Sequence, residues 1–301
     1  MALERILVPL DGSPLADGIL THVRRLLVRA DAEVKLLHVL DGPPVGLTDA
    51  SQHLEALAGS LKAEGTRAAV HVLHGDPAEE IVRAAEALDV GLIAMATHGR
   101  SGVSRVLRGS VAERVLRTST RPLFMANPLA LAPEWGPRRF QRILVPLDGS
   151  EEAGGILPVV ARVARSFESE VLLLRVEYAL GLFNGLESEP VDPGVTAFRP
   201  LSAVRASLEP MRRDLEAQGL RVRTLASYGS EADEILDAAD REDVDLVAMS
   251  THGRSGVARW FHGSVTEQVL RQCSTPLLVR RCGEVAAVLG HSTPSVGVGV
   301  A

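Results

Sequence analysis

This 301-residue chain has few aromatic residues, no excess of basic residues and no long apolar run. Aromatics make up 3% of the residues, too few for the stacking platforms that bind single-stranded nucleic acid. The formal net charge of −6 argues against a broad basic surface for DNA, RNA or an anionic membrane. No apolar run approaches the ~18 residues of a membrane-spanning helix, and the N-terminus lacks a signal-peptide pattern. We therefore expect a cytoplasmic protein with no nucleic-acid or membrane partner.

Cysteine is equally rare, because the chain contains only Cys273 and Cys282. Two cysteines do not make a disulfide framework, and their spacing fits no zinc-binding pattern. We expect two free thiols in a reducing compartment. Cys273 falls on the last expected helix, where a small apolar residue usually belongs to the core.

A long internal repeat organises the chain. The nine-residue sequence RILVPLDGS occurs at 5–13 and again at 142–150. Further on, 95–125 aligns without gaps on 249–279, and 18 of these 31 positions are identical. The chain therefore contains one domain twice, and two copies about 140 residues apart indicate a duplicated domain and not a solenoid. The expected division is domain 1 at 1–128, a Pro-containing linker at 129–140, domain 2 at 141–282 and a flexible tail at 283–301.

The second copy carries an insertion. The offset between the copies is 137 at Glu33 and Glu170 but 154 at Gly75 and Gly229, a difference of 17 residues. Most of the extra residues fall within 178–200, at the carboxyl end of an expected strand. Two interpretations fit this segment: a lid or partner-contact loop over the second site, and a neutral surface insertion.

Each copy alternates apolar runs typical of buried strands with segments typical of helices. Ser13 and Pro14 suit the start of the first helix, and Asp76 and Ser110 begin capping boxes. This alternation predicts a parallel sheet with helices on both faces, whose ligand lies where the strand order reverses. In the first copy we expect strands at 6–10, 33–40, 67–73, 90–96 and 122–126, and helices at 14–30, 50–64, from 77, and at 110–118.

The segment from Ala96 to Ser110 leaves a strand and ends at a helix N-terminus. Such a terminus presents backbone N–H groups and a partial positive charge, which suits an anion. Glycines let the backbone approach a phosphate closely, and arginines add charge nearby. The glycines here are Gly99, Gly102 and Gly109, and the arginines are Arg100, Arg105 and Arg108.

This loop matches neither of the two common nucleotide-binding motifs. No Lys-Ser/Thr pair follows its last glycine, and it does not lie after the first strand as a dinucleotide-binding loop does. A phosphate-binding loop is the interpretation that these residues favour. The alternatives are a glycine-rich turn in which Ser110 only caps a helix, and a solvated basic face.

Taken together and in this order, three motifs resemble the universal stress protein family in its tandem form. They are I-L-V-P-x-D-G-S, G-D-P-x-E-E-I and M-x-T-H-G-R-S-G…G-S-V-x-E, and the resemblance covers 4–126 and 141–281. It implies an α/β fold of the adenine nucleotide alpha hydrolase-like kind. Each of the two doubly wound domains would have a five-stranded parallel sheet, in the order 3-2-1-4-5, with helices on both faces. It also implies that the copies pair through their last strands, and a homodimer is compatible with it.

The resemblance also implies a site for ATP, with Mg²⁺ or Mn²⁺ as a possible companion. ATP-binding members carry Gly-x-x-Gly, nine residues, then Gly-Ser/Thr. Both copies match the later positions, but the leading glycine is replaced by Ala96 and Ser250. The implied binding residues are Pro9, Leu10, Asp11, Val39, Met95, Ala96, Gly99, Arg100, Gly102, Gly109, Ser110, Val111 and Ala112 in the first copy. In the second copy they are Pro146, Leu147, Asp148, Val176, Met249, Ser250, Gly253, Arg254, Gly256, Gly263, Ser264, Val265 and Thr266.

Within this implied site, Asp11 and Asp148 would contact the sugar, and the backbone at Val39 and Val176 would meet the adenine edge. The serines at 110 and 264, and the N–H groups beside them, would meet phosphates. The alternative for Asp11 is a turn residue that bonds its own backbone.

Three functions fit the sequence. The first is a stress-response protein that binds ATP or a related adenine nucleotide at one or both domains and regulates an unknown protein partner. The second is a slow ATPase, although no convincing water-positioning carboxylate is found in the loop. The third is an interaction module without nucleotide in one or both domains, which Ala96 and Ser250 favour. His98 and His252 lack a catalytic partner at recognisable spacing, so we interpret them as loop-ordering hydrogen-bonders and predict no catalytic residue or protein metal ligand.

Overall fold

The structure is a computed structural model of the chain, and it describes most of the two copies. The described residues are 4–27, 32–42, 47–97, 110–131, 139–177, 199–251 and 264–281.

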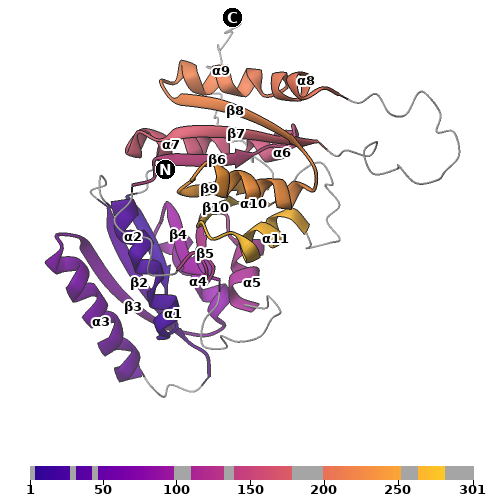
Figure 1. Ribbon diagram of the computed structural model, residues 1–301. Helices are drawn as coiled ribbons and strands as arrows, with labels where there is room; N and C mark the ends of the chain where they lie inside the picture. The colour runs from indigo at the N-terminus through magenta and orange to yellow at the C-terminus, as the bar shows by residue number, and fades with distance from the viewer. Residues whose placement is uncertain are drawn as a thin grey trace, which may run out of the picture.

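One continuous sheet of ten strands runs through the described part of the molecule (Figure 1). Its order is β3-β2-β1-β4-β5-β10-β9-β6-β7-β8, so each half has the predicted order 3-2-1-4-5, with parallel pairing inside each half. The first five strands are β1 (Arg5–Pro9), β2 (Glu33–Leu40), β3 (Arg67–His74), β4 (Leu92–Ala96) and β5 (Leu123–Ala126). The second five are β6 (Arg142–Pro146), β7 (Glu170–Glu177), β8 (Arg221–Tyr228), β9 (Leu246–Ser250) and β10 (Leu277–Arg280).

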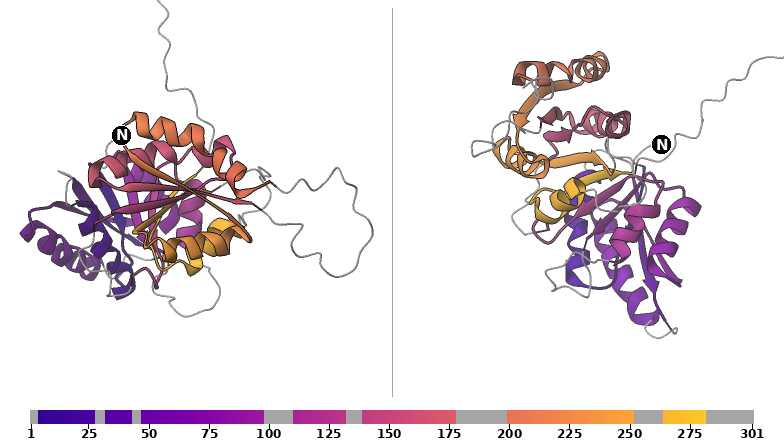
Figure 2. Two further views of the ribbon diagram at one scale, coloured as in Figure 1. Left: turned by 45° about the horizontal axis from the view of Figure 1, so that its top comes forward. Right: turned by 90° about the vertical axis from the view of Figure 1, so that its right-hand side faces the viewer.

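The two halves join through their last strands. Strand β10 pairs antiparallel with β5, and Leu278 lies opposite Phe124 at the centre of this short ladder. The pairing that the family resemblance implies is therefore confirmed. Because the junction is antiparallel, strands of the two halves run in opposite directions across the shared sheet. The carboxyl ends of the strands consequently lie at opposite edges in the two halves, which sit side by side along the sheet (Figure 2).

Helices cover both faces of this sheet, and each face has its own apolar core. One core takes residues from α1–α3, α6, α7 and α9, and the other from α4, α5, α10 and α11. The central strands are buried on both sides, as all five residues of β4 and of β9 show, which explains their uninterrupted apolar sequence. The helices of the first half are α1 (Pro14–Asp17), α2 (Ile19–Leu27), α3 (Leu47–Ala63), α4 (Pro77–Ala87) and α5 (Ser110–Thr118). Those of the second half are α6 (Glu151–Gly154), α7 (Leu157–Phe167), α8 (Leu201–Ala206), α9 (Glu209–Ala217), α10 (Glu231–Arg241) and α11 (Ser264–Gln272).

The first helix differs from its prediction. We expected one helix from 14 to 30, but the structure divides it at Gly18 into α1 and α2. Glycine is a weak helix former, and at this position a Cβ atom would lie 3.1 Å from the carbonyl oxygen of Leu15 and 3.6 Å from Cδ2 of Leu131. Residues 28–30 of the expected helix lie outside the described residues.

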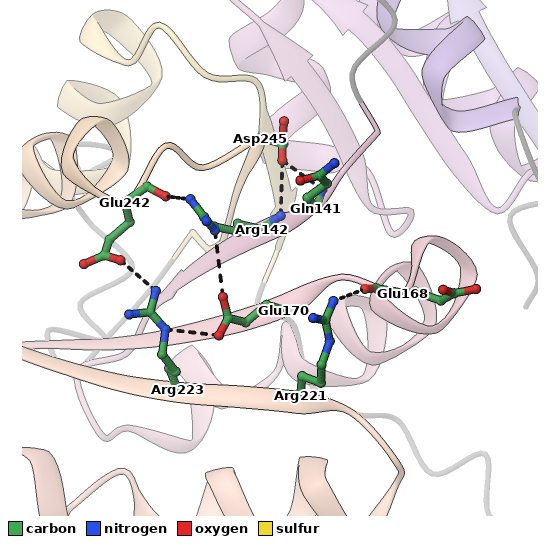
Figure 3. A network of polar contacts seen from close by, with 8 residues as sticks. All are labelled: Gln141, Arg142, Glu168, Glu170, Arg221, Arg223, Glu242 and Asp245. Carbon is green, nitrogen blue, oxygen red and sulfur yellow. Dashed lines mark hydrogen bonds and ion pairs between the residues drawn. The ribbon is translucent and has the colours of Figure 1, made fainter.

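A network of charged residues joins the starts of β6, β7 and β8 (Figure 3). Arg142 donates through Nη1 to the carbonyl oxygen of Glu242 at 2.7 Å. Arg223 donates to the carboxylates of Glu170 at 3.1 Å and Glu242 at 2.7 Å. Asp245 accepts from the backbone amides of residues 141 and 142 through Oδ2, at 2.8 and 3.1 Å. These contacts fix the amino ends of the strands, at the edge away from the predicted site of the second half.

Candidate functional site

The strand order reverses between β1 and β4, and again between β6 and β9. From β1 the chain continues to β2 on one side, whereas β4 lies on the other side of β1. Loops that leave two such strands at their carboxyl ends diverge to opposite faces and leave a crevice, which is where open α/β sheets bind ligands. The strands end at Pro9 and Ala96 in the first half and at Pro146 and Ser250 in the second.

A tight turn follows β1 and positions the first acidic residue of the candidate site. The carboxylate oxygen Oδ1 of Asp11 accepts from the backbone N–H of Ser13 at 2.9 Å and from its hydroxyl at 2.6 Å. The Ser13 hydroxyl in turn accepts from the backbone N–H of Ala16 at 3.2 Å, which caps α1. Between them Gly12 has φ of +79°, a left-handed conformation that glycine adopts without strain.

The same turn follows β6. Oδ1 of Asp148 accepts from the backbone N–H of Ser150 at 2.9 Å and from its hydroxyl at 2.5 Å, and the hydroxyl accepts from the N–H of Ala153 at 3.0 Å. Gly149 has φ of +77°. Two separate segments of the chain thus hold an aspartate directly after the first strand of each half by the same set of bonds.

These bonds bear on the two interpretations of Asp11. The alternative interpretation, a residue that bonds its own turn, describes Oδ1 correctly. Capping of the helix by Ser13 does not leave Asp11 unengaged, because one hydroxyl both caps the helix and donates to the carboxylate. This turn could have been predicted from the sequence, because aspartate two residues before serine is typical of such a turn. Contact of Asp11 with a sugar stays a prediction.

The second strand of each half extends past its neighbour at the crevice. The ladder between β1 and β2 ends at the pair Pro9–Leu37, whereas β2 stays paired with β3 as far as Leu40. The half-buried Val39 therefore lies beyond the last β1–β2 pair. Likewise, the β6–β7 ladder ends at Leu174, and the half-buried Val176 lies beyond it.

Small residues occupy the ends of β4 and β9, where the family pattern has its leading glycine. Ala96 is buried and pairs with Ala126 of β5. Ser250 is also buried, and its hydroxyl donates to the carbonyl oxygen of Ala153 in α6 at 3.3 Å. Both Cβ atoms are thus accommodated inside the fold, and in the second half the side chain links β9 to the helix that follows the aspartate turn. The preceding Met95 and Met249 are core residues.

Helices α5 and α11 begin at Ser110 and Ser264, the positions at which we predicted helix N-termini. Just inside these termini, Ala112 and Thr266 are buried, and Val111 and Val265 are half-buried. The loops before them lie outside the described residues. They include predicted site residues Gly99, Arg100, Gly102, Gly109, Gly253, Arg254, Gly256 and Gly263, and also His98 and His252.

A charged contact that the sequence analysis missed joins α5 to the start of α4. Nη1 of Arg114 lies 2.6 Å from Oδ2 of Asp76, whose Oδ1 accepts from the backbone N–H of Glu79 at 3.1 Å. The predicted cap at Asp76 is confirmed, and hydrogen bonding to Arg114 lowers the pKa of this carboxyl. The contact spans 38 positions, and no spacing rule within the chain links the two residues.

The second half uses a different pair for this link. Nε2 of Gln268 in α11 donates to Oδ1 of Asp233 in α10 at 2.9 Å. Ser230, which stands at the position of Asp76, makes no side-chain hydrogen bond as N-cap. The helix that borders each crevice is therefore tied to its neighbour in both halves, by a charged pair in one and by a neutral donor in the other.

The part of the chain that the structure describes holds no cluster of three His, Cys, Asp or Glu residues able to bind a metal ion. None of its helices is at once long and apolar enough to cross a membrane. Cys273 is buried as predicted, and burial raises the pKa of its thiol. Cys282 lies outside the described residues.

Two doubly wound α/β units, joined through their last strands and each with its own switch point in strand order, define a tandem α/β fold. The sequence model of the universal stress protein family matches residues 2–127 and 139–281. The chain belongs to the universal stress protein family, with two copies of its domain.

Comparison with known proteins agrees with this membership. A universal stress protein of Methanocaldococcus jannaschii is 34% identical over 139 residues, which cover 41% of this chain and 82% of that protein. One from Mycobacterium tuberculosis is 25% identical over 266 residues, or 84% of each chain. The crystal structure of a universal stress protein from Archaeoglobus fulgidus superposes with a TM-score of 0.71 at 23% identity, over 94% of this chain and all of that one. The structural similarity shows the tandem fold.

Proposed function

We propose that this chain is a cytoplasmic stress-response protein that binds ATP or a related adenine nucleotide in the crevice of each half, and that the bound nucleotide regulates contact with a protein partner. One observation carries the proposal. In both halves an aspartate turn and the strand leading to a helix N-terminus lie on either side of the switch point. These are the groups that a sugar and a polyphosphate require at the position where such sheets bind ligands.

Each part of the nucleotide has a proposed partner. The aspartate after the first strand of each half would accept from a ribose hydroxyl. The first N–H groups of α5 and α11 would donate to phosphate oxygens, with the glycine and arginine residues of the preceding loops. The backbone at Val39 and Val176, beyond the end of the neighbouring ladder, would meet the adenine edge. A Mg²⁺ or Mn²⁺ ion would bind with the phosphates.

A second candidate function is an interaction module with no nucleotide in one or both halves. The observation that favours it is the side chain at the leading-glycine positions, Ala96 and Ser250. The Ser250 hydroxyl bonds to α6 within its own half, so this residue has a structural use that needs no ligand.

Titration with labelled ATP separates the two candidates. We expect wild type to bind two equivalents in the presence of Mg²⁺, Gly109→Trp and Gly263→Trp to bind one each, and the double variant none. Gly59→Trp is the matched control and should bind like wild type, because Gly59 lies on the exposed side of α3 and a Cβ atom added there would meet nothing within 4 Å. Absence of binding to wild type at millimolar ATP contradicts the proposal.

Two further readouts test the regulatory part. Multiple-turnover release of phosphate above a protein-free control would assign hydrolysis to the protein instead of regulated binding. Capture of a partner should differ between wild type with ATP and wild type without it, and the double variant should not respond to ATP. A partner captured equally in all cases contradicts regulation by nucleotide.

A further inference from the structure

The end of α11 is held by a side chain from the other half of the molecule. Asn127 directly follows β5, and its side chain is buried between the halves. Its amide nitrogen Nδ2 lies within hydrogen-bond distance of three carbonyl oxygens at the end of α11. These are the carbonyl oxygens of Leu270 at 2.9 Å, Arg271 at 3.2 Å and Cys273 at 2.9 Å.

These carbonyls are groups that need an outside donor. The last four carbonyls of a helix have no intrahelical partner, and the helix end carries a partial negative charge. The contacts with Leu270 and Cys273 are buried, as is Asn127 itself at 2% exposed, whereas the contact with Arg271 is partly buried. A neutral amide offers two N–H donors, so it can pair with two of these carbonyls, or share one hydrogen between two of them, without adding charge, whereas a buried carbonyl left unpaired is costly.

The orientation of the Asn127 amide is fixed by the first half. Its Oδ1 accepts from the backbone N–H of Ala130 at 2.8 Å, and the carbonyl oxygen of Ala130 lies 2.7 Å from Nε2 of His22 in α2. Nη1 of Arg25 lies 3.0 Å from Nδ1 of the same histidine. Because a guanidinium only donates, Nδ1 accepts and Nε2 carries the proton that is donated to Ala130. A chain of hydrogen bonds thus runs from α2 through the turn after β5 to α11.

The corresponding position in the second half holds a different kind of residue. Arg281 occupies the position of Asn127 in the second half, and it is exposed. Near the end of α5 the side chains bond locally: the hydroxyl of Thr118 donates to the carbonyl oxygen of Arg114 at 2.8 Å, and the Ser119 hydroxyl donates to the carbonyl oxygen of Arg121 and accepts from its N–H. Of these two helices, α11 is the one whose end is capped by an asparagine from the neighbouring half.

We propose that Asn127 is a positioning residue for the nucleotide site of the second half, acting from the first half through α11. This inference rests on the proposed function. Helix α11 has nine residues and is about 14 Å long, so displacement of its carboxyl end also moves its amino end at Ser264. The second site therefore depends on contacts made by the first half, while the first site has no equivalent dependence on residue 281.

The test measures each site separately in the full chain. Asn127→Ala and the nearly isosteric Asn127→Asp are placed in the Gly109→Trp background, which leaves the second site, and in the Gly263→Trp background, which leaves the first. At the second site we expect the Kd for ATP to rise about fivefold with alanine and more with aspartate, since aspartate adds negative charge beside carbonyl oxygens. At the first site the Kd should change less than about twofold. The matched control Ser119→Ala, at the end of α5, should leave the second site unchanged.

A second measurement keeps the inference testable without nucleotide and separates positioning from general loss of stability. In Asn127→Ala, hydrogen exchange should become faster in α11 and stay unchanged in α5. If this variant does not fold, Asn127→Ser, which keeps one donor, should show a smaller change in the same direction. Unchanged ATP affinity at the second site, equal weakening at both sites, or unchanged exchange in α11 overturns the inference. Failure of the parent Gly109→Trp protein to bind ATP contradicts instead the proposed function of the second half.

Discussion

The turns after β1 and β6 are nearly superimposable in their bonds, whereas the contacts between the two halves are not. Each turn uses Asp-Gly-Ser, with a left-handed glycine and a serine that bonds both aspartate and helix. At the junction, Arg25 of α2 lies over Phe140 at 4.3 Å and 3.5 Å from Asp245. Arg162 occupies the position of Arg25 in the second half, but Gly91 stands where Asp245 would be required.

This difference follows from how each feature is encoded. A turn depends on a few adjacent residues, so every copy of that segment rebuilds it. A contact across the junction depends on residues of both copies, and each copy can change separately because both are in one chain. The two site turns are therefore alike. The contact of Arg25 with Asp245 across the junction, in contrast, is made by the first half with the second and has no counterpart made by the second half with the first.

The largest expected effect is at the buried ion pair. Arg25→Met leaves Asp245 buried without its cation, and removal of one partner of such a pair typically costs about 3 kcal/mol or more. Arg162→Met should cost less than about 1 kcal/mol, because burial and the nearby Arg280 already lower the pKa of Arg162 and so disfavour its charge. Urea unfolding at pH 7 measures both. Equal losses of unfolding free energy in the two variants would contradict an asymmetric junction.

The next largest effect is a pH dependence of the free energy of unfolding, which arises from a residue of the first half. Burial lowers the pKa of His22 from 6.5 to about 4. Between these values the unfolded chain takes up the proton and the folded chain does not, so the free energy of unfolding should fall as pH drops from 6.5 to 4. The full loss is about 3 kcal/mol. The valine at 159, in the equivalent position of α7, does not titrate.

Urea unfolding at pH 7, 5.5 and 4.5 tests this dependence against His22→Gln, which keeps a donor and an acceptor but does not titrate. The variant should lose less stability than wild type over this range. The raised pKa of Asp245, caused mainly by burial, acts in the opposite direction in both proteins and does not affect the comparison. Parallel pH profiles for the two proteins would contradict a buried neutral His22.

A smaller difference is expected at the starts of α4 and α10. Asp76→Ala removes the N-cap bond and the contact with Arg114, and loss of a cap typically costs about 1 kcal/mol. Ser230→Ala removes a side chain that makes no capping bond, so its cost should be below about 0.5 kcal/mol. Thermal unfolding of both variants measures the difference. A cost for Ser230→Ala as large as that for Asp76→Ala is the result that would refute it.

The smallest effect concerns the end of β9. Ser250→Ala removes the bond to the carbonyl oxygen of Ala153 and should cost about 1 kcal/mol or less, since the bond is long at 3.3 Å. It also makes the second half like the first, where Ala96 has no hydroxyl. If Ser250 is structural, ATP affinity at the second site should not change, and a large change in affinity would assign this hydroxyl to ligand binding.

Much of the fold could be predicted from the sequence because it is encoded locally. The repeated RILVPLDGS segment places β1, β6 and both aspartate turns, and alternation of strands with helices predicts the parallel sheet. The family resemblance supplied the strand order and the pairing through the last strands, both of which the structure confirms. Pro14 and Asp76 correctly marked helix starts, because caps depend on neighbouring residues.

The junction could not be predicted in the same way. Asn127 and Leu270 are 143 positions apart, and Arg25 and Asp245 are farther apart still, so no period or spacing links them. The segment that reads as a linker is held in the core at two points, since Ala130 and Phe140 are completely buried, although Leu129 at its start is exposed. Neither residue carries a local signal of this burial, which depends on both halves sharing one sheet.

The proposed function requires nucleotide at the switch point of each half, and a crystal structure of the protein soaked in excess ATP with Mg²⁺ shows whether it binds there. We predict polyphosphate at the first turns of α5 and α11, with the sugar beside Asp11 and Asp148. Crevices filled only by side chains or water, at both switch points, would contradict the account and leave the paired architecture without its proposed ligand.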